Sequence, residues 1–448
     1  MRLKLPPKVK YILDILHAHG FEAYAVGGCV RDYILARQPD DWDITTSARP
    51  EEVKACFRRT VDTGIKHGTV TVMLDDTGFE VTTYRVDGEY TDGRHPDSVT
   101  YTSLLSEDLR RRDFTINAMA YNEEDGLVDL FGGMDDLQKK VIRCVGDPNE
   151  RFDEDALRIL RAVRFSAQLD FSIENETALA VSSHVKMLSH VSAERIQVEL
   201  VKLITSKHPE AFRTLYTLGI TKMILPEFDI CMETPQNTAH HCYNVGEHII
   251  HAMCECPDSK VLRLTMLLHD IGKPCVRWTD SLGRDHFKGH AFVSADMADG
   301  ILRRLRFDND TRRRVTTLIR WHDLRPAPVD GQVRRAMYTV GPDLFEDYLS
   351  VQWADNMAKS LYQRERKLQR IRDVYEVYKG IMERGDCLSL KTLAIGGRDL
   401  VALGVRGPEI GNILEASLLA VLENPSLNDR DILLVFARWW KEHDVRLM

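Results

Sequence analysis

The chain has 448 residues, a formal net charge of −8 and 29% charged side chains. This length predicts two to four domains, and the acidic balance excludes a polybasic, nonspecific nucleic-acid binder while allowing a local basic face. The nine cysteines are scattered, which disfavours a zinc site and predicts free thiols in the cytoplasm. No stretch reads as a signal peptide or reaches membrane-spanning length, so we expect no membrane segment.

Residues 8–19 predict an amphipathic helix that packs on a first buried strand at residues 24–26. Gly27 and Gly28 then predict a tight turn, and residues 30–35 carry apolar side chains at helical spacing. A strand, a glycine turn and a helix in this order can hold phosphate, because bare amides and a helix N-terminus face the anion. Two adjacent glycines alone are as often a plain turn.

Asp41 and Asp43 follow in an Asp-x-Asp pattern. On a strand, residues two apart point the same way, so these carboxylates would lie side by side. Such charges repel unless a cation neutralises them, and Mg²⁺ prefers hard oxygen ligands. Asp-x-Asp alone is often a solvated loop, but its position after the glycine turn predicts a triphosphate cradle beside a two-metal site, as nucleotidyl transfer requires.

Gly-Gly-x-x-Arg-Asp followed by Asp-x-Asp resembles a motif of the class II nucleotidyltransferases, the family of bacterial tRNA CCA-adding enzymes and poly(A) polymerases. The resemblance implies that Asp41 and Asp43 are catalytic and bind Mg²⁺. It also implies that the nucleotide is bound in part by Gly27, Gly28, Arg31 and Asp32.

Residues 51–57 predict a short helix, and residues 67–74 and 79–84 predict a β-hairpin that turns at 75–78. Glu80 would lie on a strand beside the Asp-x-Asp segment. It is either a solvent-facing strand residue or a third metal-site carboxylate, and the resemblance favours the catalytic role. Residues 87–97 are rich in glycine and aspartate and predict a mobile loop, which resembles the loop that the family uses when switching to ATP.

Residues 104–121 begin with dense charge and continue as an apolar run, which predicts a helix with one end in an ionic site. The run Arg-Arg-Asp-x-Thr-x-Asn-Ala resembles a second family motif. Arg111 and Arg112 suit a triphosphate because a guanidinium binds phosphate in a bidentate manner. Asp113 would bind a ribose hydroxyl or orient an arginine, and the resemblance adds Asn117 to the nucleotide site. The later glycine pair at 132–133 predicts only a turn.

Residues 151–165 predict one helix on which Asp155, Arg158 and Arg161 recur at every third position. The pattern is either a row of salt bridges or a device that reads the base. An aspartate accepts from the exocyclic amine of C or A and an arginine donates to the neighbouring ring nitrogen, whereas G and U present the inverse pattern. The segment resembles the family's base-selecting motif in its CCA-adding form, which implies that Asp155 and Arg158 read the base and that Arg161 and Arg164 belong to the nucleotide site.

Residues 192–200 predict a further helix with Ser192 as its N-cap. The segment resembles another family motif. We expect Glu194, Arg195 and Glu199 to support the base-selecting helix.

Histidines and aspartates form a second constellation after residue 238. They comprise a segment at 240–248 that we expect to be helical, then His269-Asp270, His286, His290, His322 and Asp355. A lone histidine is usually structural, but imidazoles and carboxylates from several helices can surround a divalent metal. The series resembles the HD phosphohydrolase superfamily. We expect His241, His269, Asp270 and Asp355 to be metal ligands, with His290 and His322 as second choices.

Arginines concentrate at 303–306, 312–314, 334–335 and 364–372. These runs are either ordinary solvated helix faces or a groove for the phosphate backbone of tRNA. The glycine-containing segment at 396–411 resembles the C-terminal part of CCA-adding enzymes that carry an HD domain.

The sequence thus predicts an α+β protein. We expect a small mixed β-sheet nucleotidyltransferase head at 1–145, a helical neck for base selection at 146–215, a helical body with the HD domain at 216–360, and a helical tail that binds tRNA at 361–448. The resemblance implies template-independent addition of CCA to the tRNA 3′ end from CTP and ATP. Asp41, Asp43 and Glu80 would bind two Mg²⁺ ions, and the HD site a further divalent metal.

Three alternatives remain open. The enzyme could add only the terminal A, or it could be a poly(A) polymerase. In a different class, the chain would be an HD phosphohydrolase or an RNA-binding protein whose head is not catalytic.

Overall fold

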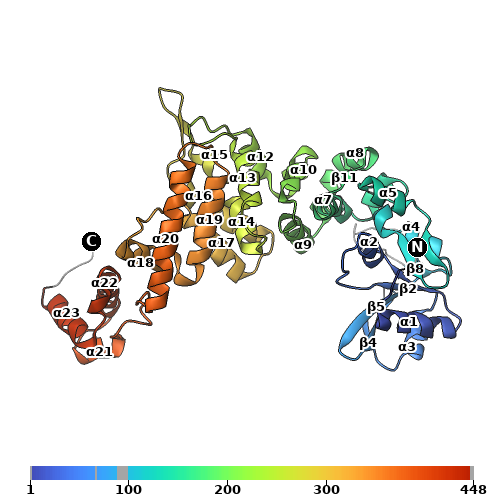
Figure 1. Cartoon of the computed structure of the whole chain (residues 1–448), viewed down its shortest axis with the longest axis horizontal. Coiled ribbons are helices and arrows are strands. Elements are labelled where there is room, and N and C mark those ends of the chain that lie inside the picture. The colour runs from blue at the N-terminus through green and yellow to red at the C-terminus, as the bar shows by residue number, and fades with distance from the viewer. Residues whose placement is uncertain (1–2, 66–67, 88–98, 444–448) are drawn as a thin grey trace. The chain divides into compact units, whose positions relative to one another are not determined.

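The computed structural model describes residues 3–65, 68–87 and 99–443. It divides into two compact units, Met1–Pro226 and Glu227–Met448 (Figure 1). The first unit contains the sheet and the second is helical apart from one short hairpin. The α+β class expected from the sequence is therefore confirmed. The loop expected at 87–97 lies, except for residue 87, outside the described residues.

A mixed seven-stranded sheet forms the base of the first unit, with strand order β3-β4-β5-β2-β1-β8-β9. β2 runs parallel to β5, and every other neighbouring pair is antiparallel. Tyr24, Val26, Tyr84, Leu109 and Ala120 form a buried cluster against it. The strands are β1 Ala23–Val26, β2 Ile44–Thr46, β3 Thr60–Gly64, β4 Thr69–Leu74, β5 Thr77–Thr83, β8 Met119–Asn122 and β9 Gly126–Asp129.

Short helices cover this sheet. The expected first helix is α1, Pro7–Ala18, which buries Val9, Ile12, Leu13 and Leu16 at helical spacing. It contacts β1 and α3, while α2 contacts β1 and β8. The remaining elements of this part are α2 Gly28–Ile34, α3 Pro50–Cys56, α4 Leu105–Arg110, α5 Gly133–Lys139, and a small pair of strands, β6 Arg85–Asp87 and β7 Val99–Tyr101.

The strand expected to carry Asp41 and Asp43 begins only at Ile44. Both aspartates lie in the segment that leads into β2, where the Asp43 carbonyl accepts a hydrogen bond from the Val26 amide at 3.0 Å. The strand starts at Ile44 because from there each residue is buried and pairs with β1 and β5.

The single helix expected across 104–121 is wrong. α4 ends at Arg110, a 3₁₀ turn follows at Thr115–Asn117, and the apolar run becomes β8. All four residues of β8 are buried, and the strand pairs with β1 on one side and β9 on the other. A short buried apolar run does not distinguish helix from strand by periodicity, and tertiary pairing decided this one.

The helix expected at 151–165 is two helices, α6 Pro148–Glu154 and α7 Leu157–Leu169. Asp155 breaks them apart with φ −146° and ψ 101°, and its side chain accepts a hydrogen bond from the Leu157 amide at 3.0 Å. The rest of this unit comprises β10 Val141–Ile142, β11 Ser172–Ile173, α8 Asn175–His184, α9 Ala193–Ile204, α10 Phe212–Thr217 and α11 Thr221–Ile224. Ser192 occupies the N-cap position of α9, but its side chain makes no capping hydrogen bond.

The second unit packs helices around α14 and α19, which contact one another and α13 and α17. The helix expected at 240–248 begins only at Val245, because Asn244 caps it through the Glu247 amide at 2.7 Å. Within the described residues, no helix combines the length and apolar character needed to cross a membrane. The elements are α12 Pro226–Glu233, α13 Val245–Cys254, α14 Lys260–Leu268, α15 Lys273–Val276, β12 Trp278–Thr279, β13 Asp285–His286, α16 His290–Arg304, α17 Asn309–Trp321, α18 Asp330–Val340, α19 Phe345–Met357, α20 Arg364–Arg384, α21 Gly397–Ala402, α22 Glu409–Glu423 and α23 Arg430–Glu442.

Candidate active sites

Three carboxylates meet in the first unit at the entrance to β2. Ile44 pairs with Val81 on the parallel strand β5, so Asp43 and Glu80, each one residue earlier, are neighbours. The pKa of Glu80 is raised by burial and then by the charges of Asp43 and Asp41. The expectation that Glu80 lies on a strand beside the Asp-x-Asp segment is confirmed, and the three exposed carboxylates are close enough for their charges to interact.

This acidic site suits a divalent cation. Burial raises the pKa of Asp43, the positive charge of Arg112 lowers it, and Asp41 raises it again. Carboxylates that repel one another in this way are stabilised by a hard cation that binds oxygen. Asp41, Asp43 and Glu80 offer oxygen donors of the type that Mg²⁺ prefers, and among the described residues they do not form a group whose ligand atoms all lie within 4.8 Å of one another.

The glycine turn lies against Arg112. Gly27 has a φ of +82°, and a Cβ built on it would lie 2.8 Å from the Arg112 Nη1 atom. Both the backbone conformation and this close approach require glycine. The turn at the start of α2 and one of the arginines expected to bind phosphate are therefore in contact.

A chain of hydrogen bonds joins α2 to α7. Arg31 donates to Asn117 Oδ1 at 2.6 Å and to both carboxylate oxygens of Asp32 at 2.9 Å. Asn117 donates in turn to Asp113 at 3.0 Å, and Arg161 donates to the other Asp113 oxygen at 2.7 Å. Burial opposes the Asp113 charge, but Arg161 and Asn117 hold its pKa below the usual range. Of its two expected roles, Asp113 here performs the orientation of an arginine.

A buried aspartate that the sequence interpretation missed anchors the two adjacent arginines. Asp108 is fully buried, accepts from Thr45 at 3.0 Å, and lies 2.7 Å from Arg111 and 3.6 Å from Arg112. Its position three and four residues before these arginines on a helical segment was the available signal. Asp108 fixes the positions of both guanidinium groups.

Asp155 and Arg158 are close in sequence but do not form an ion pair with each other. Asp155 pairs with Arg195 on α9 at 2.6 Å, and Arg158 pairs with Glu154 at 2.6 Å. Arg158 also donates to the Arg111 carbonyl at 2.8 Å. The alternative interpretation, a row of salt bridges among Asp155, Arg158 and Arg161 along one helix, is therefore wrong, because the break at Asp155 allows its side chain to pair with Arg195 on α9.

Arg164 lies inside the contact between α7 and α9. It donates to Glu199, also buried, and its guanidinium lies 3.8 Å from the centre of the Phe165 ring. Burial lowers its pKa and the Glu199 charge opposes this. Arg195 and Glu199 thus support α7 and the segment before it, as expected. Arg164 contributes to the same contact between α7 and α9.

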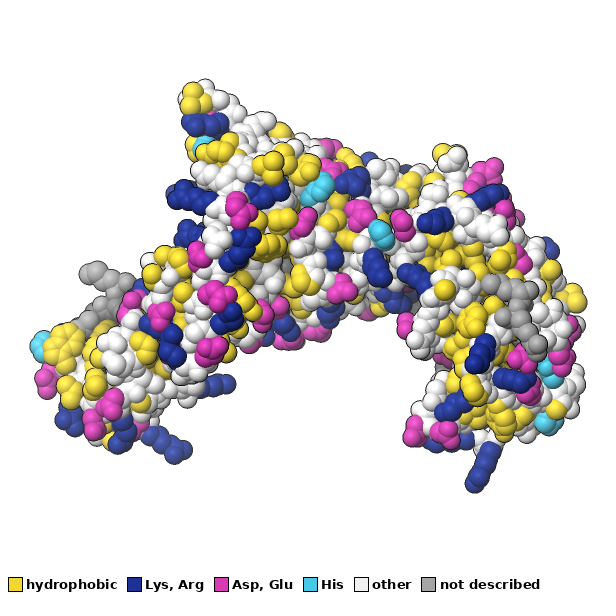
Figure 2. Space-filling model, in the orientation of Figure 1, with side chains coloured by type: hydrophobic (Ala, Val, Ile, Leu, Met, Phe, Trp, Pro, Cys, Tyr) yellow, Lys and Arg dark blue, Asp and Glu magenta, His cyan; other side chains and the backbone are white. Residues whose placement is uncertain are grey.

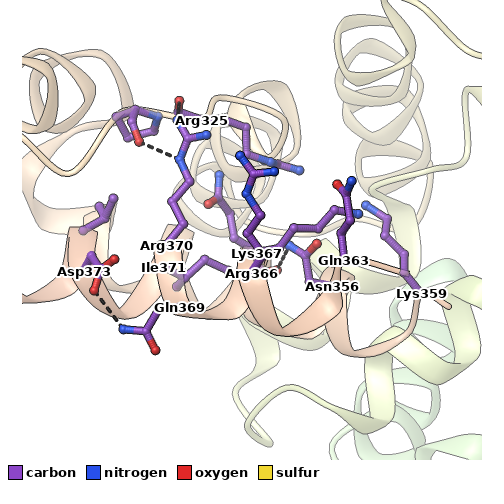
Figure 3. Close-up of a pocket in the computed structure, with 13 residues that line it drawn as sticks. Arg325, Asn356, Lys359, Gln363, Arg366, Lys367, Gln369, Arg370, Ile371 and Asp373 are labelled. Carbon is purple, nitrogen blue, oxygen red and sulfur yellow. Dashed lines mark hydrogen bonds between the residues drawn. The ribbon is translucent and has the colours of Figure 1, made fainter. Parts of the chain in front are cut away.

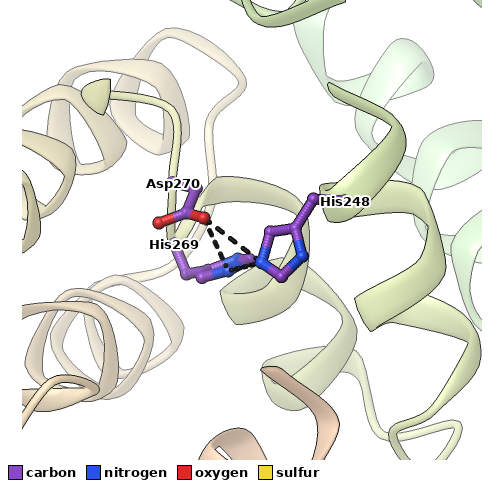
Figure 4. Close-up of side chains that lie close together, drawn as sticks. All are labelled: His248, His269 and Asp270. Carbon is purple, nitrogen blue, oxygen red and sulfur yellow. Dashed lines mark hydrogen bonds and ion pairs between the residues drawn. The ribbon is translucent and has the colours of Figure 1, made fainter. Parts of the chain in front are cut away.

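The second unit collects a buried cluster of histidines and aspartates from separate helices. His248 Nε2 and His269 Nε2 each lie 3.3 Å from Asp270 Oδ2, and the two ring nitrogens are 3.2 Å apart (Figure 4). Asp355, from α19, reaches His248 Nε2 at 3.2 Å. The ligand atoms of His248, His269 and Asp270 all lie within 4.8 Å of one another and could hold a single metal ion.

A second group shares Asp270. Its other oxygen, Oδ1, lies 3.2 Å from His290 Nε2 and 3.9 Å from His322 Nε2. Within the described ranges, these two groups are the sets of three or more ligand atoms that all lie within 4.8 Å of one another. A carboxylate between two imidazole groups is suited to bridge two divalent ions.

Three of the four predicted metal ligands lie in this cluster, and the fourth, His241, lies beside it. His269, Asp270 and Asp355 lie in the cluster, but His248 was not expected as a ligand. Its position on the apolar face of α13, with Val245 and Ile249, was the signal.

His241 lies beside the cluster, with its ring centre 5.4 Å from that of His248, and lines the same cavity of about 390 Å³. Burial, then the Lys273 charge, lowers its pKa to about 2, which keeps the imidazole neutral as metal binding requires. His286 stands apart, paired with Asp280 at 3.0 Å.

Unsatisfied polar atoms show that this cluster fits a metal. Neither oxygen of Asp270 has a hydrogen bond of normal geometry, although Lys273 Nζ lies 2.6 Å from Oδ2. The Nδ1 atom of His241 is also buried without a partner. Buried acceptors of this kind, around an accessible cavity, are the donors that a divalent cation coordinates.

The expected basic runs of the second unit are largely neutralised. Ion pairs join Arg303 and Arg312 to Asp299, Arg304 to Glu227, Arg313 to Asp310, Arg314 to Asp347, Arg334 to Asp386 and Arg335 to Glu423. On the face shown in Figure 2, basic and acidic side chains are interspersed. These runs therefore favour solvated, paired helix faces over one continuous basic groove.

Three family models match separate parts of the chain. The model described as "Poly A polymerase head domain" matches residues 23–143, and "Probable RNA and SrmB- binding site of polymerase A" matches residues 170–232. "HD domain" matches residues 238–360. The matched ranges contain the acidic site of the first unit and the histidine cluster of the second.

Curated relatives are CCA-adding enzymes. The enzyme of Levilactobacillus brevis is 53% identical over 210 residues, which are 47% of this chain and 53% of that protein. The enzyme of Enterococcus faecalis is 52% identical over 193 residues, 43% of this chain and 48% of that protein. The chain thus spans about half the length of the curated relatives it matches.

Solved structures match over almost the whole length. The Bacillus stearothermophilus CCA-adding enzyme in complex with CTP has a TM-score of 0.72 at 26% identity, covering 98% of this chain and 99% of that one. The Thermotoga maritima CCA-adding enzyme complexed with tRNA shares the fold, with a TM-score of 0.56 at 20% identity over 98% of this chain and 100% of that one. The first part of the chain is thus similar in sequence to CCA-adding enzymes and matches the poly(A) polymerase head model, its later part matches the HD domain, and the chain as a whole shares the fold of CCA-adding enzymes.

Proposed function

We propose that the first unit adds C and A to the 3′ end of tRNA from CTP and ATP, without a template. The observation that carries this proposal is the meeting of three carboxylates, Asp41, Asp43 and Glu80, beside a glycine turn covered by Arg112. The sequence identity of 50–53% to curated CCA-adding enzymes, over about half of this chain, supports the same reaction.

In this proposal the three carboxylates hold two Mg²⁺ ions. When bound, Mg²⁺ would supply positive charge at the reacting phosphate and lower the pKa of the attacking 3′-hydroxyl. Arg112, with Arg111 anchored on the same Asp108, binds the triphosphate. Gly27 allows phosphate to approach the backbone closely, and Gly28 begins α2.

The rest of the nucleotide site gives the substrate a fixed orientation. Arg31 is held by hydrogen bonds to Asp32 and Asn117, so the orientation of its guanidinium group is fixed. Asp155 and Arg158 are held by Arg195 and Glu154, and a rigid pair is what base discrimination needs. We propose that this pair accepts C and A and rejects G and U. We further propose that residues 361–448 contribute to tRNA binding.

A direct assay tests the proposal against its alternatives. The purified protein is incubated with tRNA that lacks its CCA end, with each nucleotide separately and with CTP plus ATP, and the products are sequenced. CCA addition appears only with both CTP and ATP. An enzyme that adds only A would extend tRNA ending in CC but not the shorter tRNA. A poly(A) polymerase would produce long A tails, and no incorporation at all would overturn the proposal.

We propose a second activity, metal-dependent hydrolysis of a phosphoester, for the HD centre. The observation that favours it is the pair of ligand groups that share Asp270. His248 and His269 form one group with it, beside Asp355, and His290 and His322 form the other. Phosphatase and phosphodiesterase assays with added Mn²⁺, Ni²⁺ or Mg²⁺, against a control with EDTA, test this activity.

A further inference from the structure

A second cavity lies next to the HD centre, between α19, α20 and the segment that follows α17. Its volume is about 660 Å³, which is within the range of sites for nucleotide-sized ligands. Figure 3 shows Arg366, Lys367 and Arg370 of α20 directed to the same space as Arg325. The full lining adds Pro326, Gln352, Asn356, Lys359, Gln363, Gln369, Ile371, Asp373 and Val374.

The cavity carries uncompensated positive charge. Five lysine and arginine side chains line it. Two of them, Arg325 and Lys359, pair with Asp323 and Asp355, and the one acid in the lining, Asp373, accepts a hydrogen bond from Gln369. In the described part of the chain, Arg366, Lys367 and Arg370 pair with no carboxylate, unlike the arginine runs elsewhere in this unit. Arg370 donates instead to the backbone carbonyls of Pro326 and Arg325, which fixes its guanidinium at the cavity wall.

The same side chains connect this cavity to the HD centre. Lys359 lines both cavities, and its Nζ atom lies 2.5 Å from Asp355 Oδ2. Arg325 lies 3.6 Å from the same oxygen. On the other side, Lys367 Nζ lies 3.2 Å from Nδ1 of His240, the residue before His241. The positive charge is therefore adjacent to the candidate metal ligands.

Burial and the neighbouring charges also shift the pKa of Lys367. Burial lowers its pKa and the charge of Lys359 lowers it further, while Asp355 raises it and Arg325 lowers it by a smaller amount. Cations that repel one another around an open space are stabilised by an anion. The Arg366 guanidinium, which lines the same cavity, matches phosphate oxygens in geometry.

We propose that this cavity binds a phosphate group, and that it holds the second phosphate of a ligand whose first phosphate lies at the HD centre. The preferred ligand is then a ribonucleotide that carries phosphate at two positions, or the phosphorylated end of a short RNA, rather than a monophosphate. This inference rests on the proposed phosphohydrolase activity for the first phosphate only. The binding of the second phosphate is independent of catalysis.

Binding measured in EDTA separates the cavity from the metal centre. Isothermal titration calorimetry compares adenosine 3′,5′-bisphosphate with adenosine 5′-monophosphate on the full chain and on the double variant Arg366→Ala with Lys367→Ala. The matched control is Arg372→Ala with Lys379→Ala, which removes the same charges from α20 outside the cavity lining. Circular dichroism verifies that both variants fold.

We expect the bisphosphate to bind more tightly than the monophosphate, and the cavity variant to weaken bisphosphate binding by about tenfold or more, since two charge-assisted contacts are lost. The control variant keeps wild-type affinity. Equal affinity for the two nucleotides, or equal weakening in both variants, would overturn the proposal. A short RNA with a 3′-phosphate, titrated in parallel, identifies which of the two sources binds better.

Hydrolysis assays distinguish this proposal from the activity on which it rests. With Mn²⁺ added, the cavity variant should raise the KM for the bisphosphate by about tenfold and leave kcat and monophosphate hydrolysis unchanged. Absence of any hydrolysis in wild type would overturn the phosphohydrolase activity alone, and the calorimetry would still decide whether the cavity binds phosphate.

Discussion

Asp155 and Arg195 form an ion pair of 2.6 Å that joins the end of α6 to α9. The same aspartate accepts the Leu157 amide at the start of α7, so one side chain fixes the relation of three helices. A carboxylate held on both sides has a defined direction, which is a requirement for reading a base edge.

If the fixed orientation of the Asp155 carboxylate serves base selection, the Asp155→Ala variant should lose activity with CTP and ATP. Its preference for CTP and ATP over UTP and GTP should also become smaller. A contact to a base edge contributes about 1–3 kcal/mol of discrimination, so we expect the preference to fall roughly tenfold to a hundredfold. Relative kcat/KM for the four nucleotides on one tRNA measures it. Asp153→Ala, which removes an exposed carboxylate from α6, serves as the control. An unchanged preference profile would leave Asp155 with a purely structural role.

The acidic site of the first unit should be essential for the addition of both nucleotides. Because we propose that Asp41 and Asp43 share one metal site with Glu80, Asp41→Ala or Asp43→Ala should reduce incorporation of C and of A to background. Asp40→Ala removes the adjacent exposed carboxylate and should retain activity. Single-nucleotide incorporation with Mg²⁺ is the measurement. Near-normal incorporation by either site variant would contradict the metal assignment.

The HD centre should be separable from nucleotide addition. His269→Ala combined with Asp270→Ala removes Asp270, which both ligand groups share, and His269 of the first group, so metal binding and any phosphoester hydrolysis should be lost. CCA addition should stay largely intact, because these residues lie in the other compact unit. Metal content is measured by mass spectrometry after dialysis, with His286→Ala as the matched control. Loss of addition with an unchanged circular dichroism spectrum would mean that the two sites depend on each other.

Asp308 should make the stability of the second unit depend on pH. It caps α17 through the Thr311 amide at 2.8 Å, and this hydrogen bond lowers its pKa to about 2. A carboxyl whose folded pKa is depressed stabilises the fold above its unfolded pKa, near 4, and this stabilisation is lost as the pH falls toward 2. At pH 7, Asp308→Ala should lower the free energy of unfolding by about 1 kcal/mol.

The difference between wild type and Asp308→Ala should therefore shrink as the pH falls from 5 to 3, measured by urea denaturation. Asp308→Asn keeps a capping oxygen but does not titrate, so its stability should lack this component of the pH dependence. A constant difference between wild type and Asp308→Ala at all pH values would show that the carboxylate charge is not involved.

The local motifs allowed much of both sites to be predicted. The glycine turn, Asp41 and Asp43, and the Arg111–Asn117 run occur within short stretches whose spacing reflects direct chemical needs. Glu80 was placed correctly because an alternating pattern next to a turn predicts a hairpin. His248 and Asp108 were missed, since each acts through partners that are distant in sequence or hidden on an apolar face.

The sequence by itself determined the α+β class and the residue types that the proposed chemistry requires, because these depend on composition and short-range periodicity. Only the tertiary structure decided that residues 119–122 form a strand, that Asp155 breaks a helix and pairs with Arg195, and that most arginines of the second unit are neutralised. Each of these depends on which partner meets a side chain or strand in space. Local periodicity carries no information about a partner forty or more residues away.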